Sequence, residues 1–218
     1  MALISYAPPT SPYLDIKYQD EDILILNKPS GLLSVPGKAP EHRDCLQYRA
    51  QRVLPTATIV HRLDMATSGL LVMAMNKAAH RHISKQFELR QTRKSYIAEV
   101  YGHIEQESGE VDLPLICDWP NRPKQMVDHT RGKSAQTHWQ VLSRQETSTR
   151  VELTPITGRS HQLRVHMLSI GHPILGDRLY AHEQALSMSS RLLLHAQSLS
   201  FKHPQLEQIM TFDCPAPF

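Results

Sequence analysis

The segment His61-Arg62-Leu63-Asp64-Met65-Ala66-Thr67-Ser68-Gly69-Leu70 places one carboxylate beside one guanidinium, just before an apolar stretch that continues to Met75. The apolar residues after Gly69 are typical of a buried strand, and the polar residues before them are typical of a turn. Arg62 lies on the same side as Asp64 if the segment is extended. An aspartate at such a place is either a reactive group or a cap for the turn, and the residues alone leave both open.

The composition is that of an ordinary globular protein: 218 residues, 40% hydrophobic and 21% charged. No apolar run approaches the roughly 20 residues that a membrane span needs, and no basic segment followed by an apolar one indicates a secretory signal. Three isolated cysteines form neither a disulfide framework nor a zinc half-site. We therefore expect a cytoplasmic protein that does not enter membranes.

Strands and helices are interspersed, and several strands are close enough in sequence to form hairpins. Strands are predicted at 15–18, 23–27, 70–75, 95–101, 137–142, 150–154 and 192–201. Helices are predicted from a cap at Asp44 to Leu54, over 77–89, and from a cap at Ser160 to Ile170. This order favours an α+β fold with a mixed, mostly antiparallel sheet and flanking helices. Residues 115–134 and 172–190 are predicted to be long loops, and residues 1–14 an extended arm.

The net charge of +3 and the pI of about 8.8 allow a polyanionic partner without proving one. Basic residues gather at 90–94 and 122–133, a pattern that solvated surfaces also show. The second segment contains Trp119 between prolines and basic residues, which suits contacts with RNA and equally suits a packed hairpin tip.

A second polar cluster, Gly158-Arg159-Ser160-His161-Gln162-Leu163-Arg164-Val165-His166, falls at the start of a predicted helix. Arg164 there is placed to enter a cleft and pair with a buried carboxylate, or to form a surface ion pair. His161 and His166 are five residues apart, a poor helical spacing for one metal ion. We find no metalloprotease, dinucleotide, phosphate-loop or nucleophile-elbow motif, so neither a metal nor a cofactor is expected.

Asp64 has no second carboxylate nearby in sequence, which disfavours a hydrolase that uses two carboxylates. A single aspartate still serves as nucleophile or base if a cation keeps it ionised and water is excluded. Tyr96, on a predicted strand, is either a core residue or a neighbour of that site.

Six segments in the same order resemble the RluA-type pseudouridine synthases. They are Asn27–Gly31, His61–Asp64 with Thr67–Gly69, Lys94–Tyr96, Gly158–His166, His172–Asp177 and Leu193–Ala196. The resemblance implies an α+β pseudouridine synthase catalytic domain with a central RNA-binding cleft, spanning residues 1–218 as a single domain. Too few residues precede the first segment to hold the S4-type RNA-binding domain of many relatives.

The resemblance also implies roles for individual residues. Asp64 would be the catalytic aspartate, Arg164 its cationic partner, Tyr96 the residue that stacks on the base, and Leu194 an apolar lining of the pocket. Arg62 would fill the space that a flipped nucleotide leaves. Arg122 and Lys124 lie in a basic cluster that would contact RNA phosphates.

Cys117-Asp118-Trp119-Pro120-Asn121-Arg122-Pro123-Lys124-Gln125 is similar to the short, dual-specificity member of the family. This similarity implies action on uridines in 23S ribosomal RNA and in transfer-RNA anticodon stem-loops. The sequence does not reveal the oligomeric state, and we take a monomer as the default. Two alternatives remain at this point: a catalytically inactive RNA-binding protein of the same fold, and a metal-dependent hydrolase of small molecules.

Overall fold

The computed structural model describes residues 6–218, which divide into two units. The Asp64 unit contains residues 6–94 and 196–217, and the Arg164 unit contains residues 95–195 and Phe218. The first five residues of the predicted arm lie outside the described residues. The expectation of one catalytic domain stays a prediction, and each unit is described by itself.

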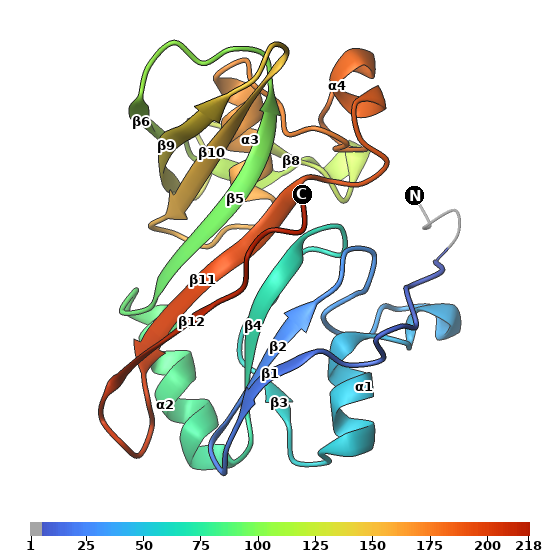
Figure 1. The fold of residues 1–218 in the computed structure, drawn as a ribbon, viewed down its shortest axis with the longest axis vertical. Coiled ribbons are helices and arrows are strands. Elements are labelled where there is room, and N and C mark those ends of the chain that lie inside the picture. Colours follow the sequence, from blue (N-terminus) through green and yellow to red (C-terminus); the bar gives the residue numbers. More distant parts are fainter. Residues whose placement is uncertain (1–5) are drawn as a thin grey trace. The chain divides into compact units, whose positions relative to one another are not determined.

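The Asp64 unit is built on antiparallel strands. Its elements are β1 (Ile16–Gln19), β2 (Ile23–Lys28), α1 (Leu46–Val53), β3 (Thr58–Ile59), β4 (Ser68–Ala74), α2 (Lys77–Glu88), most of β11 (Leu194–Lys202), and β12 (Ile209–Asp213), with a short 3-10 helix at Pro40–His42. β2 pairs with β1 and β4, β3 also pairs with β4, and β12 pairs with β11 (Figure 1). The strands predicted at 15–18, 23–27 and 70–75 are confirmed within two residues.

The core of this unit lies against β4, all seven residues of which are buried. The Asn76 side chain accepts a hydrogen bond from the Ala79 N–H and so begins α2, which packs against the sheet through Ala79 and Ile83. Val72 and Phe201 belong to the same apolar cluster. Burial of each large apolar side chain stabilises the fold by about 1.5–3 kcal/mol.

The start of α1 differs from the prediction. Its N-cap is Cys45, whose sulfur accepts a hydrogen bond from the Tyr48 N–H. The Asp44 carboxylate instead forms two bonds to the guanidinium of Arg49, at 2.7 and 2.6 Å, and the Arg49 side chain is fully buried. An ion pair competes with capping for this carboxylate, so the helix begins one residue later than the sequence suggests. Arg49 also donates to the Pro9 carbonyl, which ties the described part of the arm to α1.

Gly69 is required where β4 begins. Its φ is +114°, and a Cβ there would lie 2.3 Å from the carbonyl oxygen of Ala196 on β11. Only glycine accepts both this conformation and this close approach. The strand that follows Asp64 therefore depends on this residue for its path.

The Arg164 unit also has an antiparallel sheet, in the order β5-β10-β9-β6. The strands are β5 (Arg93–Tyr101, of which 95–101 belong here), β6 (Ser108–Asp112), β9 (Gln136–Arg144) and β10 (Ser148–Pro155). The predicted hairpin of 137–142 and 150–154 is confirmed as β9 and β10. The predicted loop at 115–134 instead contains a second hairpin, β7 (Leu115–Cys117) and β8 (Gln125–Val127), with a 3-10 helix at Trp119–Asn121.

Two helices complete this unit, α3 (Gln162–Ser169) and α4 (Glu183–Ser187). The predicted cap at Ser160 is wrong: the N-cap is His161, which has a φ of +53° and no capping side-chain bond. Gly171, with a φ of +86°, follows the end of α3, as its position in the sequence suggests. No helix within residues 6–218 is long and apolar enough to cross a membrane.

Candidate active site

The turn that carries Asp64 lies between β3 and β4 of the Asp64 unit, and it is fixed through its backbone. The Thr67 N–H donates to the Asp64 carbonyl at 3.1 Å. Leu63, the residue before Asp64, is bonded to the buried Ser34 hydroxyl. That hydroxyl donates to the Leu63 carbonyl at 2.6 Å and accepts from the Leu63 N–H at 3.1 Å. Leu63 is buried, whereas Arg62 is exposed and Asp64 is half-buried. The apolar residue between the two charged ones thus anchors the segment.

A buried ammonium group holds the same turn from the other side. Lys28, with no exposed surface, donates from Nζ to the carbonyl oxygens of Met65 at 3.0 Å, Pro29 at 2.9 Å and Leu32 at 2.7 Å. Burying a charge is costly unless hydrogen bonds replace its hydration, and three carbonyls do so here. Lys28 therefore joins the residue after Asp64 to the loop that follows β2.

Two neighbours of Lys28 add bonds to the same turn. The Ser30 hydroxyl donates to the Ala66 carbonyl at 2.7 Å, and the Gly31 N–H donates to the Met65 carbonyl at 2.8 Å. The segment Asn27–Gly31, which the sequence offered only as a family motif, is thus the support for the backbone after Asp64.

His61, at the start of the Arg62–Asp64 segment, is a neutral packing residue. Its ring stacks on Phe87 with centroids 4.5 Å apart, and its Nε2 accepts a hydrogen bond from the Val72 N–H at 3.1 Å. Burial, with a smaller contribution from the charge of Lys94, lowers the pKa of His61 to about 3. His61 therefore stays uncharged at neutral pH and fixes where the segment leaves the core.

Arg164 lies on α3 of the other unit and is held by an ion pair. Its Nε and Nη2 donate to the two carboxylate oxygens of Asp177 at 2.7 and 2.6 Å, and both side chains are at least 95% buried. The sequence left open whether Arg164 pairs with a buried carboxylate or forms a surface ion pair. The structure shows a pair with the buried carboxylate of Asp177, which had no predicted role. Asp177 leaves Nη1 outside this pair, and pairing of Arg164 with Asp64 stays a prediction.

The backbone around Asp177 is specialised for this role. The preceding Gly176 has a φ of +70°, and a Cβ there would lie 1.9 Å from the carbonyl oxygen of Arg191. Asp177 Oδ1 also accepts a bond from the Leu179 N–H at 2.9 Å. The carboxylate is therefore oriented by its own loop as well as by Arg164.

Tyr180 was not identified from the sequence, yet it contacts several parts of this site. Its ring centroid is 5.0 Å from the Arg164 guanidinium. Its hydroxyl accepts a hydrogen bond from the Gln125 N–H at 2.7 Å and lies 2.7 Å from His161 Nδ1. Tyr180 thus links Gln125 of β8 to Arg164 and to His161, the N-cap residue of α3. The motif His172–Asp177 stops three residues short of it.

The start of α3 is fastened to β9 through the buried Gln162. Its amide oxygen accepts bonds from the Thr157 hydroxyl at 2.7 Å and the Arg159 N–H at 3.0 Å. Its amide nitrogen donates to the Gln136 carbonyl at 2.9 Å. These bonds fix the first residue of the helix that carries Arg164, whose N-cap His161 makes no capping side-chain bond.

The structure places the other predicted site residues in the Arg164 unit. Tyr96 is half-buried on β5, opposite Leu153 of β10, and Leu194 is buried at the first position of β11. Arg122 and Lys124 lie at the end of the β7–β8 hairpin, where the Arg122 guanidinium is 4.5 Å from the Trp119 ring centroid. The structure thus brings Arg62 and Asp64 together in one unit, and Tyr96, Arg164, Leu194, Arg122 and Lys124 fall in the other.

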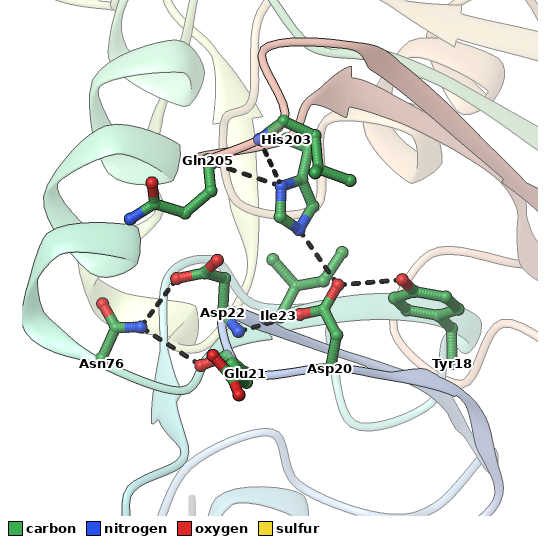
Figure 2. A network of polar contacts seen from close by, with 9 residues as sticks. Tyr18, Asp20, Glu21, Asp22, Ile23, Asn76, His203 and Gln205 are labelled. Carbon is green, nitrogen blue, oxygen red and sulfur yellow. Dashed lines mark hydrogen bonds and ion pairs between the residues drawn. The ribbon is translucent and has the colours of Figure 1, made fainter.

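One group of metal-ligating residue types lies close together in the described chain: Asp20, Asp22 and His203, in the Asp64 unit (Figure 2). His203 Nδ1 accepts from the backbone N–H groups of Gln205 and Leu206, and Nε2 lies 3.0 Å from Asp20 Oδ2. Nε2 therefore carries the proton in this bond.

The remaining oxygens of this group are also engaged. Asp20 Oδ1 accepts from the N–H groups of Asp22 and Ile23, and Asp20 Oδ2 accepts from the Tyr18 hydroxyl (Figure 2). Asp22 Oδ1 accepts from the Asn76 amide at 2.8 Å. These bonds join the β1–β2 turn to the segment between β11 and β12 and to the start of α2, so the arrangement is that of a structural network.

Comparison with protein families gives one match over most of the chain. Residues 22–169 match the model of the family described as RNA pseudouridylate synthase. The matched segment includes the Asp64 turn, its supporting residues and Arg164.

Several curated proteins are similar over nearly their whole length. The dual-specificity RNA pseudouridine synthase RluA of Yersinia pestis is 60% identical over 204 residues, covering 93% of this chain and 99% of the relative. The protein of the same name from Escherichia coli (strain K12) is 56% identical over 219 residues and covers both chains completely.

Among solved structures, human RNA Pseudouridylate Synthase Domain Containing 1 is similar with a TM-score of 0.82 and 29% identity. The match covers 97% of this chain and 87% of the human one.

Proposed function

This chain belongs to the RNA pseudouridylate synthase family and is an isomerase, and from that premise we propose that it modifies uridines in two kinds of RNA through Asp64. The relatives reported above are named as dual-specificity enzymes. We propose 23S ribosomal RNA and transfer-RNA anticodon stem-loops as the substrates. Unpaired loops suit such an enzyme, because a base that is already unstacked costs less to extrude.

The reaction rearranges one nucleotide. The bond between N1 and C1′ breaks, the uracil turns while it is held, and C5 bonds to C1′. C5 loses a proton and N1 gains one, so product and substrate are isomers. In this proposal the Asp64 carboxylate either attacks C1′ or removes a ribose proton, and both routes need the ionised form.

The observation that carries this proposal is the support of the Asp64 turn. Ser34, Lys28 and Ser30 bond the backbone of residues 63, 65 and 66, so the turn that carries the carboxylate is held in place through its main chain. Such preorganisation is what a catalytic group requires. The Asp64 carbonyl accepts the Thr67 N–H, which is a further backbone bond within the same turn.

The remaining site residues are assigned roles that rest on the family. Arg164, oriented by Asp177, would be the cationic partner of the Asp64 carboxylate. Tyr96 would stack on the base and Leu194 would line the pocket. The exposed Arg62 would occupy the place of the extruded nucleotide. Arg122 and Lys124 would contact the RNA.

We propose further that the protein is a cytoplasmic monomer, forms one catalytic domain with an RNA-binding cleft, and works without a metal. Cys45 and Cys117 are present as thiols, which suits a reducing compartment. Activity unchanged in excess chelator would support the metal-free mechanism, whereas its loss, with restoration by a divalent cation, would contradict it.

Replacing Asp64 by Asn tests the catalytic role. We expect pseudouridine formation in a stem-loop RNA to fall by more than about a thousandfold, because Asn neither attacks C1′ nor accepts a proton. RNA affinity should stay close to that of the parent, since phosphate contacts dominate it. Asp213→Asn, a change of an exposed carboxylate on β12, is the matched control.

Two outcomes would contradict the proposal. Undiminished turnover of the Asp64→Asn variant would remove Asp64 from the chemistry. If the parent protein bound RNA but formed no pseudouridine, the alternative of an inactive RNA-binding protein of this fold would be favoured.

A further inference from the structure

The tip of the β7–β8 hairpin exposes a tryptophan. Trp119 has 65% of its surface exposed, more than Tyr13 at 45% or Tyr48 at 44%, the other highly exposed aromatic residues in the described chain. The second tryptophan, Trp139 on β9, is 8% exposed. Exposing so large an apolar ring costs solvation free energy, so its position at a hairpin tip requires a reason.

A guanidinium lies over this ring. The Arg122 carbon Cζ is 4.5 Å from the Trp119 centroid, within the range of a cation–π contact. Among residues 6–218, neither Arg122 nor its neighbour Lys124 forms an ion pair. The tip therefore combines a flat π surface with two positive charges outside any ion pair, while the one carboxylate of the tip, Asp118, accepts from the Asn121 amide.

The tip is ordered by its own hydrogen bonds. The Asp118 N–H donates to the Lys124 carbonyl at 3.0 Å, and the Lys124 N–H donates to the Asn121 carbonyl at 3.1 Å. The Asn121 amide donates to the Asp118 carboxylate at 2.9 Å. A surface that is already ordered loses little conformational entropy on binding.

The hairpin is also fixed relative to Arg164 within the same unit. The Gln125 N–H bonds the Tyr180 hydroxyl, and the Tyr180 ring lies over Arg164. Val127 and Tyr180 pack on the buried cluster that contains Leu115 and Val165. The exposed ring is thus held at a set position from the arginine of the proposed active site.

We propose that Trp119 and Arg122 form a stacking site for an unpaired nucleobase of the RNA substrate, with Lys124 at an adjacent phosphate. The proposal rests on the proposed function for the presence of RNA. Every base has a π face, so such a site tolerates many sequences and suits an enzyme that acts on two RNAs. The positive charge of the tip complements the phosphates beside the base.

The first experiment measures equilibrium binding of a stem-loop RNA. Trp119→Ala should weaken binding about tenfold, the effect expected for loss of one base stack, while Trp119→Phe should retain most of the affinity. Tyr48→Ala, which removes an exposed aromatic residue near Arg52 on α1, should leave affinity unchanged.

Salt dependence distinguishes stacking from charge. Trp119→Ala should keep the parent slope of the binding constant against salt concentration. Lys124→Ala should reduce that slope by about 0.7, the value for one phosphate contact in a single strand. Lys124→Ala therefore shows the effect of losing a charge from the same hairpin tip, for comparison with the loss of the ring in Trp119→Ala.

The second experiment identifies the occupant. RNA should quench the fluorescence of the parent protein, and Trp119→Phe should remove most of that change, because Trp139 is buried. Loop bases are then replaced one at a time by abasic sites. One abasic RNA should bind the parent as weakly as intact RNA binds Trp119→Ala, and that variant should show no further loss with it.

The proposal is overturned if Trp119→Ala binds intact RNA like the parent, or if every abasic RNA loses affinity equally with both proteins. Either result would mean that Trp119 does not stack on a base of the RNA, and that it serves another partner or only the contact with Arg122. They differ from failure of the proposed function, in which the parent itself forms no pseudouridine.

Discussion

Asp64 and Arg164 are held in their respective units by different kinds of contact. Around Asp64 the bonds go to the backbone, from the side chains of Lys28 and Ser34. Arg164 is held through its own side chain by the Asp177 carboxylate. Backbone support fixes the path of the chain that carries the carboxylate. Side-chain support fixes the direction of a guanidinium, which has donors to spare.

The largest effect is expected at the side-chain contact. Asp177→Ala leaves the Arg164 charge buried without its carboxylate, so the free energy of unfolding should fall by about 3–5 kcal/mol in urea denaturation. Glu107→Ala removes the exposed partner of Arg144 in the same unit and should cost about 0–1 kcal/mol. Equal losses for the two variants would mean that the buried pair adds nothing beyond a surface one.

The backbone contact should be somewhat less costly to remove. Lys28→Met keeps the length of the side chain but leaves three carbonyls without their donor, so we expect a loss of about 2–4 kcal/mol in the free energy of unfolding. Lys85→Met, at an exposed position on α2, is the control and should change stability little. Turnover should fall with Lys28→Met even where the protein is fully folded. If the folded Lys28→Met variant turned over RNA at the parent rate, Lys28 would not be needed to position the Asp64 turn.

His61 adds a pH dependence to the Asp64 side of the comparison. Its pKa is about 3 in the folded protein, against 6.5 when unfolded, so the unfolded state binds more protons between these pH values. Stability should therefore be unaffected by His61 above pH 6.5 and fall below it by up to about 1.4 kcal/mol per pH unit. His61→Gln, which retains an acceptor for the Val72 N–H, should flatten the profile. An unchanged slope would contradict this.

The smallest effect on stability is expected at Arg62. Because its side chain is exposed, Arg62→Ala should change the free energy of unfolding by less than about 0.5 kcal/mol. Turnover should nevertheless fall on the order of tenfold, because nothing then fills the place of the extruded base. Arg52→Ala on α1 should affect neither quantity. If stability changed and turnover did not, Arg62 would be a structural residue.

The sequence predicted those elements whose apolar pattern is strong. β2 and β4 are continuous apolar runs, and α2 has both a periodic apolar face and an asparagine cap. β6 and β12 were missed because most of their side chains are exposed or half-buried, so neither shows a clear apolar alternation. The hairpin of β7 and β8 was missed because strands of three residues are too short for any periodicity.

The sequence pointed to the candidate site where unusual residues stand together, and it missed the residues whose role depends on the fold. The Asp64 turn could be located because a carboxylate, a guanidinium and a glycine precede a buried strand. Lys28 could not be assigned, since lysine is rarely fully buried and its partners are backbone oxygens. Asp177 could not be identified as the partner of Arg164, because the path of the loop at Gly176 brings it there and no local sequence pattern reveals that path.

The complete burial of the Lys28 amine makes it an internal reporter. Amine-reactive reagents modify lysines that solvent reaches, so the folded protein should be labelled at exposed positions such as Lys85 long before Lys28. Labelling at Lys28 then requires the loop around residues 29–32 to open. Following the mass of that one peptide over time would measure how often the chain beneath the Asp64 turn opens, without any added probe.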